Sequence, residues 1–368
     1  MRILQCIPSM DGGGAERQLT YLAAELEALD QEVHVAVISR GVNWARMVTS
    51  GATIHQLRAG GVHDPRLFWQ LLKLIRSIDP DIVQVWLRQM DILGGLAALA
   101  LRKPVIISER ASESAYPRSF KHTVRSSMGR FTSAIVSNSG EGDRYWSHRT
   151  NPRTLRYVIP NAIPLSEITQ APVAQDLPAP GDRRVVMFAG RLEPQKNIET
   201  LLDALQVALP EDDFDVVCCG VGTLRARIVE WIGRNGLEDR VTLIGYTPAL
   251  WSLMKRASVL VSPSLFEGSP NVVLEAMACR CPLVISDIPE HRAMLDEAAA
   301  ILVNPRSATQ LAAGIRDVLR DPDAALRRAD AAFARIQRFT PASIAQQYLD
   351  VYRTILARPA AAVRSAST

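Results

Sequence analysis

The most informative segment of the chain is SLFEGSPNVVLEAMA, residues 264–278. It begins as a Gly/Pro loop that contains Glu267 and continues into an apolar, helix-like run that contains Glu275. A loop that feeds a helix exposes unpaired backbone N–H groups at the helix start, and these groups favour anions. A carboxylate on the same element accepts hydrogen bonds from sugar hydroxyls. The stretch therefore indicates a site for a phosphorylated sugar.

A second segment, FAGRLEPQKN at residues 188–197, is a strand end followed by two cations. Arg191 offers a forked set of donors and Lys196 offers a point charge, a pair that suits two phosphates. Lys196 also stands at the start of the next predicted helix, whose positive end favours anions. The alternative is that Arg191 and Lys196 are two solvated surface cations. The presence of the stretch at residues 264–278 favours the phosphate interpretation.

Together the two segments resemble the signature of the family-4 retaining glycosyltransferases. The resemblance extends from the glycine loop near the N-terminus to about residue 286. It implies the GT-B fold, an α/β architecture of two Rossmann-like, doubly wound domains that face each other across a cleft. It also implies a metal-independent enzyme of polysaccharide biosynthesis that moves a hexosyl or related group from a nucleotide-diphosphate sugar, such as a UDP-sugar, to a lipid-linked or cell-surface glycan acceptor.

The resemblance assigns roles to particular residues. It implies that Arg191, Lys196 and Glu267 are catalytic, with the two cations on the diphosphate and Glu267 on the donor sugar, and that Glu275 binds the ribose. It implies that backbone groups near Tyr246 help to read the base. The full set implied to bind donor or nucleotide is Gly13, Gly14, Gly190, Arg191, Lys196, Tyr246, Glu267, Gly268, Ser269, Pro270, Asn271, Val272 and Glu275.

The N-terminal half departs from the family pattern where many members carry a His near the reacting centre. This chain has IISERAS at residues 106–112, so Glu109 and Arg110 are the candidates for an acceptor site. An Arg cannot serve as a general base at neutral pH, but it can hold an anionic acceptor or neutralise a leaving diphosphate. Gln84 and Trp86 replace a second common His pair. Arg280 stands where Gly is usual, which matters if φ is positive there.

Other functions remain as alternatives. The glycine run at residues 12–14 follows the first strand, and in the resembled family this loop faces the donor diphosphate. A dehydrogenase would carry G-x-G-x-x-G and an acid after the second strand, and residues 38–40 offer none. A GT-B sugar-nucleotide epimerase would need carboxylates and His at the sugar. A non-catalytic sugar-nucleotide-binding protein is suggested by Arg110 in the His position.

The composition describes a globular protein. The chain has 368 residues, enough for two domains, with 48% hydrophobic and 22% charged residues. No apolar run reaches 18 residues, and the N-terminus is too strand-like for a signal peptide, so we expect a cytoplasmic protein without a membrane span. The five cysteines form no metal-binding pattern, which favours buried, reduced thiols. We expect no metal and no cofactor.

The charge is uneven along the chain. Residues 1–168 carry 20 Lys/Arg against 15 Asp/Glu, whereas residues 169–368 carry 22 against 23. The cations Arg118, Lys121, Arg125 and Arg130 are spaced as if on one helix face, and the apolar Phe120, Val124, Met128 and Phe131 lie between them. The pattern predicts either a solvated basic face over core residues or a peripheral contact with the anionic inner membrane surface. No nucleic-acid-binding module is present.

Strand and helix patterns alternate throughout, which predicts parallel sheets with helices on both faces. A Pro/Gly-rich stretch at residues 169–182 separates an acceptor domain, residues 1–168, from a donor domain, residues 169–340. We expect the last helix, within residues 341–358, to return to the first domain, and the residues after 358 to fray. The predicted strands are residues 3–7, 33–38, 82–86, 105–108, 135–137, 185–189, 216–219, 241–244, 259–262 and 283–286. The predicted helices are residues 15–29, 65–78, 92–101, 198–209, 224–235, 249–257, 272–279, 309–319 and 344–357.

Overall fold

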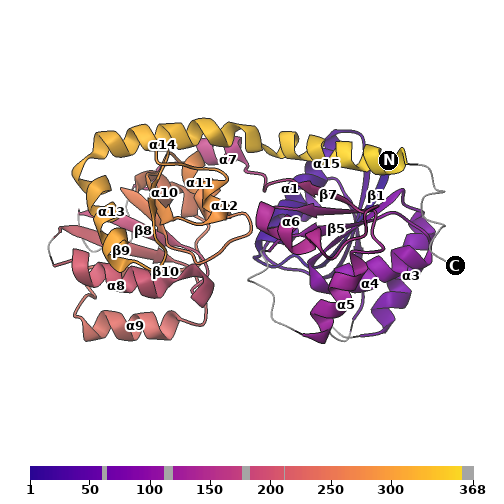
Figure 1. Cartoon of the computed structure of the whole chain (residues 1–368), viewed down its shortest axis with the longest axis horizontal. Coiled ribbons are helices and arrows are strands. Elements are labelled where there is room, and N and C mark those ends of the chain that lie inside the picture. The colour runs from indigo at the N-terminus through magenta and orange to yellow at the C-terminus, as the bar shows by residue number, and fades with distance from the viewer. Residues whose placement is uncertain (60–63, 112–118, 176–182, 211, 359–368) are drawn as a thin grey trace. The chain divides into compact units, whose positions relative to one another are not determined.

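The chain divides into two compact units (Figure 1). The computed structural model describes residues 1–59, 64–111, 119–175, 183–210 and 212–358. Unit 1 comprises residues 1–162 and the C-terminal segment from Phe339, and unit 2 comprises Ile163–Arg338. The helix α7 (Leu165–Gln170) therefore opens unit 2, whereas the sequence placed the boundary at 168/169. Part of the expected linker, residues 176–182, and the tail expected to fray both lie outside the described residues.

Unit 1 is built on a seven-stranded sheet in the order β3-β2-β1-β4-β5-β6-β7, and every neighbouring pair is parallel. The chain starts in the middle of the sheet and builds outward in both directions, the doubly wound arrangement that the alternating pattern predicts. The strands are β1 (Arg2–Ser9), β2 (Glu32–Ser39), β3 (Thr53–Gln56), β4 (Ile82–Trp86), β5 (Val105–Glu109), β6 (Ala134–Ser137) and β7 (Leu155–Val158).

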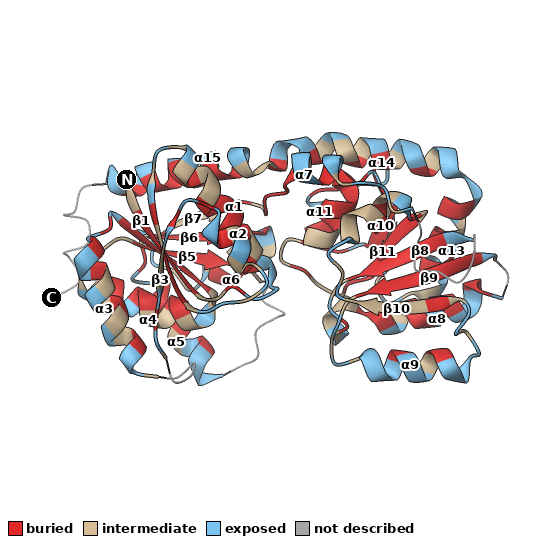
Figure 2. Cartoon of the chain, turned by 180° about the vertical axis from the view of Figure 1, so that it is seen from behind, coloured by how far each residue is buried: buried red, intermediate tan, exposed pale blue. Residues whose placement is uncertain are grey.

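Helices cover both faces of this sheet. The helices α3, α4 and α5 pack on one face, and α1 with α15 packs on the other (Figures 1 and 2). Every residue of β4 is buried, because helices cover both faces of this central parallel strand; its one polar residue, Gln84, is hydrogen-bonded. The helices of unit 1 are α1 (Gly14–Ala28), α2 (Trp44–Val48), α3 (Arg66–Ile78), α4 (Leu87–Ala100), α5 (Phe120–Met128), α6 (Gly140–Ser147) and α15 (Pro341–Leu356).

The C-terminal helix α15 is part of the core of unit 1. Thr340 caps its start, since the Thr340 side chain accepts a hydrogen bond from the Ser343 amide, and Pro341 occupies the first turn, where no N–H donor is needed. Tyr348 and Tyr352 are buried against the sheet. The helix packs on α1, so residues from the two ends of the chain share one core.

Unit 2 repeats the architecture with a six-stranded parallel sheet in the order β10-β9-β8-β11-β12-β13. Its strands are β8 (Arg184–Ala189), β9 (Phe214–Cys219), β10 (Val241–Gly245), β11 (Val259–Ser262), β12 (Leu283–Ser286) and β13 (Ile301–Val303). Its remaining helices are the 3-10 turn η2 (Pro194–Lys196), then α8 (Ile198–Ala208), α9 (Arg225–Arg234), α10 (Leu250–Arg256), α11 (Asn271–Ala278), α12 (Pro289–Arg292), α13 (Ala308–Arg320) and α14 (Pro322–Ile336).

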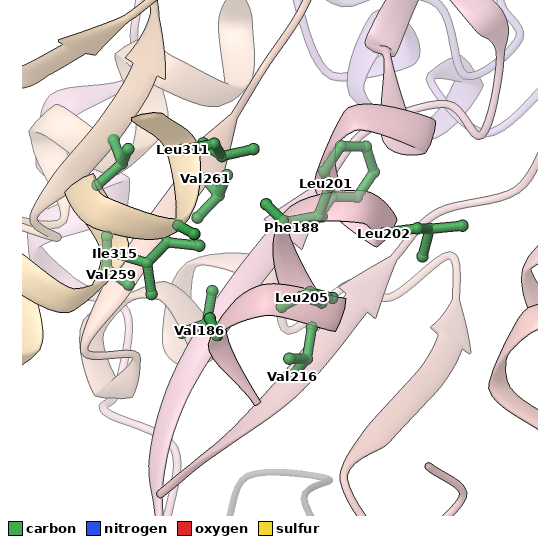
Figure 3. Close-up of a cluster of buried hydrophobic side chains, with 14 of the residues drawn as sticks. Val186, Phe188, Leu201, Leu202, Leu205, Val216, Val259, Val261, Leu311 and Ile315 are labelled. Carbon is green, nitrogen blue, oxygen red and sulfur yellow. The ribbon is translucent and has the colours of Figure 1, made fainter. Parts of the chain in front are cut away.

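The core of unit 2 explains why its sheet is rigid at the site. Figure 3 shows Phe188 from β8 and Val261 from β11 among the aliphatic side chains of α8 and α13. Both residues are fully or almost fully buried, as are Leu201 and Leu311 opposite them. The carboxyl ends of β8 and β11, where the predicted site residues follow, are therefore held by close packing. The predicted two-unit α/β fold class is confirmed.

Some elements were not predicted. The strands β3 and β7 are short edge strands in which every residue is exposed or half-buried, so they lack the continuous apolar runs of the central strands. The helix α4 begins at Leu87, earlier than the predicted residue 92. Its first turn is polar, with Arg88, Gln89 and Asp91, and this hid the helix start from hydrophobic periodicity.

The structure corrects the proposed basic face of α5. Arg125 is 2% exposed and forms ion pairs with Asp91 at 2.6 Å and Glu109 at 2.9 Å, so it is not a surface cation. Met128 is also buried. Lys121 and Arg130 are exposed, whereas Arg118 lies outside the described residues. The even spacing of cations did not reveal that carboxylates from α4 and β5 lie opposite one of them.

Candidate functional site

The central pair of the site is Lys196 and Glu267. Gly190 directly follows β8, and Glu267 lies in the loop after β11; the two strands are neighbours in the sheet. Ligands of open α/β sheets bind outside the carboxyl ends of the strands, and both loops leave from that edge. The Lys196 Nζ lies 2.5 Å from Glu267 Oε1, so the structure brings together two residues that are distant in the sequence.

Glu267 is held from several sides. It is only 5% exposed, and the same Oε1 accepts a hydrogen bond from the Ser264 hydroxyl at 2.6 Å. The Glu267 amide donates to Glu290 Oε1 at 3.2 Å. A buried carboxylate needs such partners, because loss of hydration is otherwise uncompensated. The carboxylate is thus preorganised, and its charge is balanced by Lys196.

Asn197 positions the lysine. Its backbone is left-handed, with φ at 54°, a conformation that Asn tolerates better than most residues. The Asn197 side-chain amide donates to the Pro263 carbonyl at 2.9 Å and to the Pro305 carbonyl at 2.6 Å. One side chain therefore ties the lysine turn to the loop that carries Glu267. The sequence analysis did not include Asn197 among the site residues.

Arg191 differs from Lys196 in its surroundings. It is exposed, and its guanidinium donates to Gln195 Oε1 at 3.0 Å. Gln195 in turn donates to the Phe266 carbonyl at 2.9 Å and accepts from the Leu265 amide at 3.0 Å through its own carbonyl. Arg191 is therefore linked to the Glu267 loop through Gln195 while its charge remains exposed to solvent.

The glycines beside Arg191 have a backbone reason. The φ of Gly220 is +148°, and a Cβ there would lie 1.8 Å from the Gly190 carbonyl oxygen. The Gly190 amide donates to the Cys219 carbonyl at 2.9 Å, so the turns after β8 and β9 are in direct backbone contact. This contact gives the Gly220–Gly222 turn a structural role, because only a residue without a Cβ allows the two turns to approach so closely.

Glu275 lies in α11, on the same loop-and-helix element as Glu267. Glu275 is 1% exposed, so its carboxylate is enclosed by the protein. Residues Gly268–Val272, which were predicted to contact the donor, run from Glu267 into the start of α11, the helix that carries Glu275. At the end of the same helix, Arg280 has φ at 54°, which explains why Gly is usual there. Its guanidinium stacks over the Phe333 ring at 4.1 Å and pairs with Asp330.

Three of the predicted residues, Tyr246, Gly13 and Gly14, belong to other elements of the chain. Tyr246 follows β10 at the edge of the sheet and is 70% exposed. Gly13 and Gly14 belong to unit 1, where they follow β1 and open α1. A Cβ on Gly13 would lie 2.1 Å from Glu16 Oε2, so a larger residue there would displace the Glu16 carboxylate. The predicted role of this loop at the donor remains a prediction.

The two acceptor candidates have structural partners in unit 1. Glu109 is fully buried, where its carboxylate pairs with Arg125 and accepts a hydrogen bond from the Trp146 indole at 2.9 Å. Arg110 stacks over Trp86 at 4.3 Å and donates to the Tyr348 hydroxyl of α15. The Arg125 and Trp146 contacts engage the Glu109 carboxylate inside unit 1, so the structure supports a structural role for Glu109 in place of the predicted acceptor contact.

Sequence reasoning missed a buried histidine beside the pair. His291, in the short helix α12 after β12, is fully buried, and its Nδ1 lies 2.7 Å from the Ser286 carbonyl oxygen. A carbonyl only accepts, so Nδ1 carries the proton and Nε2 keeps its lone pair. Burial lowers the pKa of His291, with Lys196 adding to the fall and Glu267 opposing it. The sequence signal that could have identified His291 is its position just after the strand β12.

The described residues contain neither a candidate metal site nor a helix that could cross a membrane. There, no group of three His, Cys, Asp or Glu side chains is arranged to hold a metal ion. No described helix combines the length and apolar character that a membrane crossing requires. All five cysteines are buried and free of disulfides, and burial raises the pKa of the Cys6 thiol to about 12.

Two parallel α/β units, one of them with a cation–carboxylate pair at the carboxyl ends of its strands, define a GT-B-type protein. A model of "Glycosyl transferases group 1" matches residues 170–335, and a model of "Glycosyltransferase Family 4" matches residues 12–167. The chain belongs to the family-4 glycosyltransferases of the GT-B fold. The predicted family and its enzyme class are confirmed.

Individual relatives agree with this assignment. The chain is 28% identical over 179 residues to the alpha-D-kanosaminyltransferase of Streptomyces kanamyceticus, and the match spans about half of either protein, 47% of this chain and 46% of the relative. It is 24% identical over 365 residues to a Campylobacter jejuni enzyme, N-acetylgalactosamine-N,N'-diacetylbacillosaminyl-diphospho-undecaprenol 4-alpha-N-acetylgalactosaminyltransferase, across 93% of this chain and 97% of that one.

A solved structure shares the fold. HepE from Anabaena, in complex with UDP-glucose, superposes with a TM-score of 0.84 at 21% identity, covering 96% of this chain and 100% of that one. At this identity the likeness shows the fold alone.

Proposed function

We propose that this chain transfers a sugar from a nucleotide-diphosphate sugar to an acceptor, with retention of configuration at the anomeric carbon. The observation that carries the proposal is the contact of Lys196 with the buried Glu267 at the carboxyl ends of β8 and β11. This arrangement sets a cation for phosphate beside a carboxylate for sugar hydroxyls. Solved neighbours of the same fold bind UDP or UDP-glucose, which supports a donor of this class.

The chemistry that follows is charge stabilisation. As the bond between the anomeric carbon and the phosphate oxygen breaks, negative charge develops on the leaving diphosphate. Lys196 and Arg191 stabilise that charge, and Glu267 orients the sugar through its hydroxyls. The acceptor oxygen attacks from the side that the diphosphate leaves, and the diphosphate takes the acceptor proton. Two cations then do the work that a metal ion does in other glycosyltransferases.

The first experiment identifies the donor base. Purified protein is mixed with UDP, GDP, ADP, CDP and dTDP, and the melting temperature is measured with and without EDTA. A ligand that binds only the native state raises stability by RT ln(1 + [L]/Kd), about 2.7 kcal/mol at a hundredfold excess over Kd. We expect one nucleotide to stand out in EDTA. No stabilisation by any of them would contradict the proposal.

The second experiment tests transfer. The matching sugar nucleotide is supplied with an acceptor, and the product is analysed for its anomeric configuration. A polyprenyl-diphosphate glycan is the first acceptor to test, because the Campylobacter jejuni relative is named for one. Nucleotide binding without transfer or donor hydrolysis across a panel of acceptors would favour the non-catalytic sugar-nucleotide-binding protein. Isomerisation of the free sugar nucleotide would favour the epimerase.

We also propose that unit 1 contacts the anionic cytoplasmic surface of the membrane through the ends of α5. Phe120 is 82% exposed and Phe131 is 67% exposed, with the exposed cations Lys121 and Arg130 next to them. Each cation near anionic lipid contributes about 1 kcal/mol, and salt screens the attraction over about 10 Å. We expect co-sedimentation with phosphatidylglycerol vesicles at low salt and loss of binding at high salt. Equal, negligible binding to neutral and anionic vesicles would refute this contact alone.

A further inference from the structure

We propose that His291 is a positioning residue for Glu267 and takes up a proton when Lys196 turns from Glu267 to the phosphates of a bound donor. The inference rests on the proposed function, because a donor diphosphate is what draws Lys196 away. It adds a proton-linked step to donor binding and a role for a residue outside the family signature.

The contacts form a continuous chain from the lysine to the histidine. Lys196 Nζ pairs with Glu267 Oε1 at 2.5 Å, and the Ser264 hydroxyl donates to the same oxygen at 2.6 Å. The Ser264 carbonyl accepts from the Ser286 hydroxyl at 2.6 Å, and the Ser286 carbonyl accepts from His291 Nδ1 at 2.7 Å. His291 is thereby oriented by the same layer of residues that holds Glu267.

Charge balance makes the step necessary. In the structure, Glu267 and Lys196 neutralise each other, with side chains only 6% and 14% exposed. If Lys196 moves to the diphosphate, the Glu267 carboxylate stays behind without its counter-charge. A buried, uncompensated carboxylate is costly, and a nearby group that gains a proton restores the balance.

His291 is the group placed to do so. Its Nε2 is buried and has no hydrogen-bond partner among the described residues, so its lone pair is free to take up a proton. The charged groups that face His291 are Lys196 from η2, Glu267 from the loop after β11, Asp287 after β12, and Glu290 beside it in α12. Asp287 is paired with Arg292 at 2.6 Å, and Glu290 accepts from the Glu267 amide.

The sign of the pH dependence follows. Burial, and after it the charge of Lys196, hold the pKa of His291 down in the free protein, so departure of Lys196 removes part of this effect and raises that pKa in the bound state. A group whose pKa rises on binding favours binding at pH values below its bound-state pKa. Donor affinity is therefore greatest below the free-state pKa, falls by at most about tenfold per pH unit between the two pKa values, and is lower above both.

Calorimetry tests the step directly. The nucleoside diphosphate that raises the melting temperature most is titrated into the protein in buffers of different ionisation enthalpy, which measures protons taken up per nucleotide bound. We expect uptake of up to about one proton in the wild type and a clear reduction in His291→Asn. Asn keeps a donor for the Ser286 carbonyl but has no site for the proton. His148→Asn, at an exposed His of unit 1, should bind like the wild type.

The outcomes separate the two proposals. The phosphate of the nucleotide titrates as well, but it does so with both proteins, so the difference between wild type and His291→Asn isolates the histidine. Nucleotide binding with equal proton uptake in both proteins would overturn the role of His291 and leave the transferase intact. No nucleotide binding at all would overturn the proposed function together with this inference.

A measurement without ligand covers the case in which His291→Asn fails to fold. Lys196→Met removes the cation and leaves His291 in place, as donor binding does. Histidine ring resonances followed by NMR between pH 4 and 8 should show the pKa of one buried His rising in Lys196→Met relative to the wild type. Arg191→Met, which removes an exposed cation nearby, is the matched control and should leave that resonance unchanged. An unchanged His291 in Lys196→Met would refute the coupling.

Discussion

At the scale of single residues, Lys196 and Arg191 carry the same charge in different surroundings. Lys196 compensates a carboxylate that is 5% exposed, whereas Arg191 is exposed and donates to the neutral side chain of Gln195. Removal of Lys196 therefore affects both the fold and the donor, and removal of Arg191 affects the donor alone.

The first prediction uses this difference. Arg191→Ala and Lys196→Ala should each lower kcat/KM by an amount equivalent to about 2.7–4 kcal/mol, because each removes a donor aimed at developing charge. Only Lys196→Ala should also destabilise the protein, by about 3 kcal/mol in urea unfolding, because it leaves Glu267 buried and unbalanced. Wild-type kcat/KM in both variants would show that the phosphate assignment is wrong.

The second prediction concerns Glu275. Glu275→Gln keeps the size of a side chain that is 1% exposed and removes its charge. Loss of a charge-assisted bidentate contact to the ribose should raise the donor KM about tenfold or more, with kcat less affected. Binding of the nucleoside diphosphate, measured by calorimetry, should weaken in parallel. A variant that unfolds instead would indicate a structural carboxylate.

At the scale of elements, α5 is attached to the sheet by charge as well as by apolar contacts. Arg125 lies between Asp91 of α4 and Glu109 of β5, and its guanidinium is 5.0 Å from the Trp146 ring. An ion pair of this kind is not strong evidence of stability by itself, because desolvation offsets the attraction. Removal of Arg125 alone is destabilising, since the two carboxylates then remain buried without a counter-charge.

The third prediction follows from that asymmetry. Arg125→Met should cost about 3–5 kcal/mol in the free energy of unfolding, because Asp91 and Glu109 lose their common cation. Lys121→Met on the exposed side of the same helix should change it by no more than about 0.5 kcal/mol. The two variants remove the same charge, so denaturant midpoints distinguish a buried anchor from a surface cation. Equal midpoints would contradict the buried arrangement.

At the scale of the whole molecule, the last helix completes the sheet of unit 1. The Tyr352 hydroxyl donates to Gln84 of β4 and accepts from Gln5 of β1 at 3.3 Å. Gln84 donates to the Ser108 hydroxyl at 2.6 Å, and Trp86 donates to Gln5 at 2.7 Å. The Gln84 and Trp86 that replace the common His pair are thus parts of a network that fastens α15.

The fourth prediction tests that network. Tyr352→Phe removes one hydroxyl and leaves buried amide groups unsatisfied, so it should lower the free energy of unfolding by about 1–3 kcal/mol. Gln347→Ala, on the exposed face of α15, should have an effect below about 0.5 kcal/mol. Thermal unfolding followed by circular dichroism measures both. If Tyr352→Phe matched the wild type, the network would not contribute to the attachment of the helix.

The sequence by itself determined the features that depend on local pattern. Alternation of apolar strands such as residues 105–108 with amphipathic helices predicted two parallel sheets, because a strand covered on both faces is mostly apolar. The position of Lys196 after one strand and of Glu267 after another placed both at a ligand-binding edge, since parallel strands end on the same side.

Only the tertiary structure decided what lies opposite each side chain. Arg125 has the spacing of a surface cation, yet Asp91 and Glu109 meet it from α4 and β5. His291 belongs to no motif, yet it follows β12 and lies close enough to Glu267 to feel its charge. Periodicity specifies which face of an element a residue occupies, but burial and charge balance depend on partners far away in the chain, and these are set when the sheets assemble.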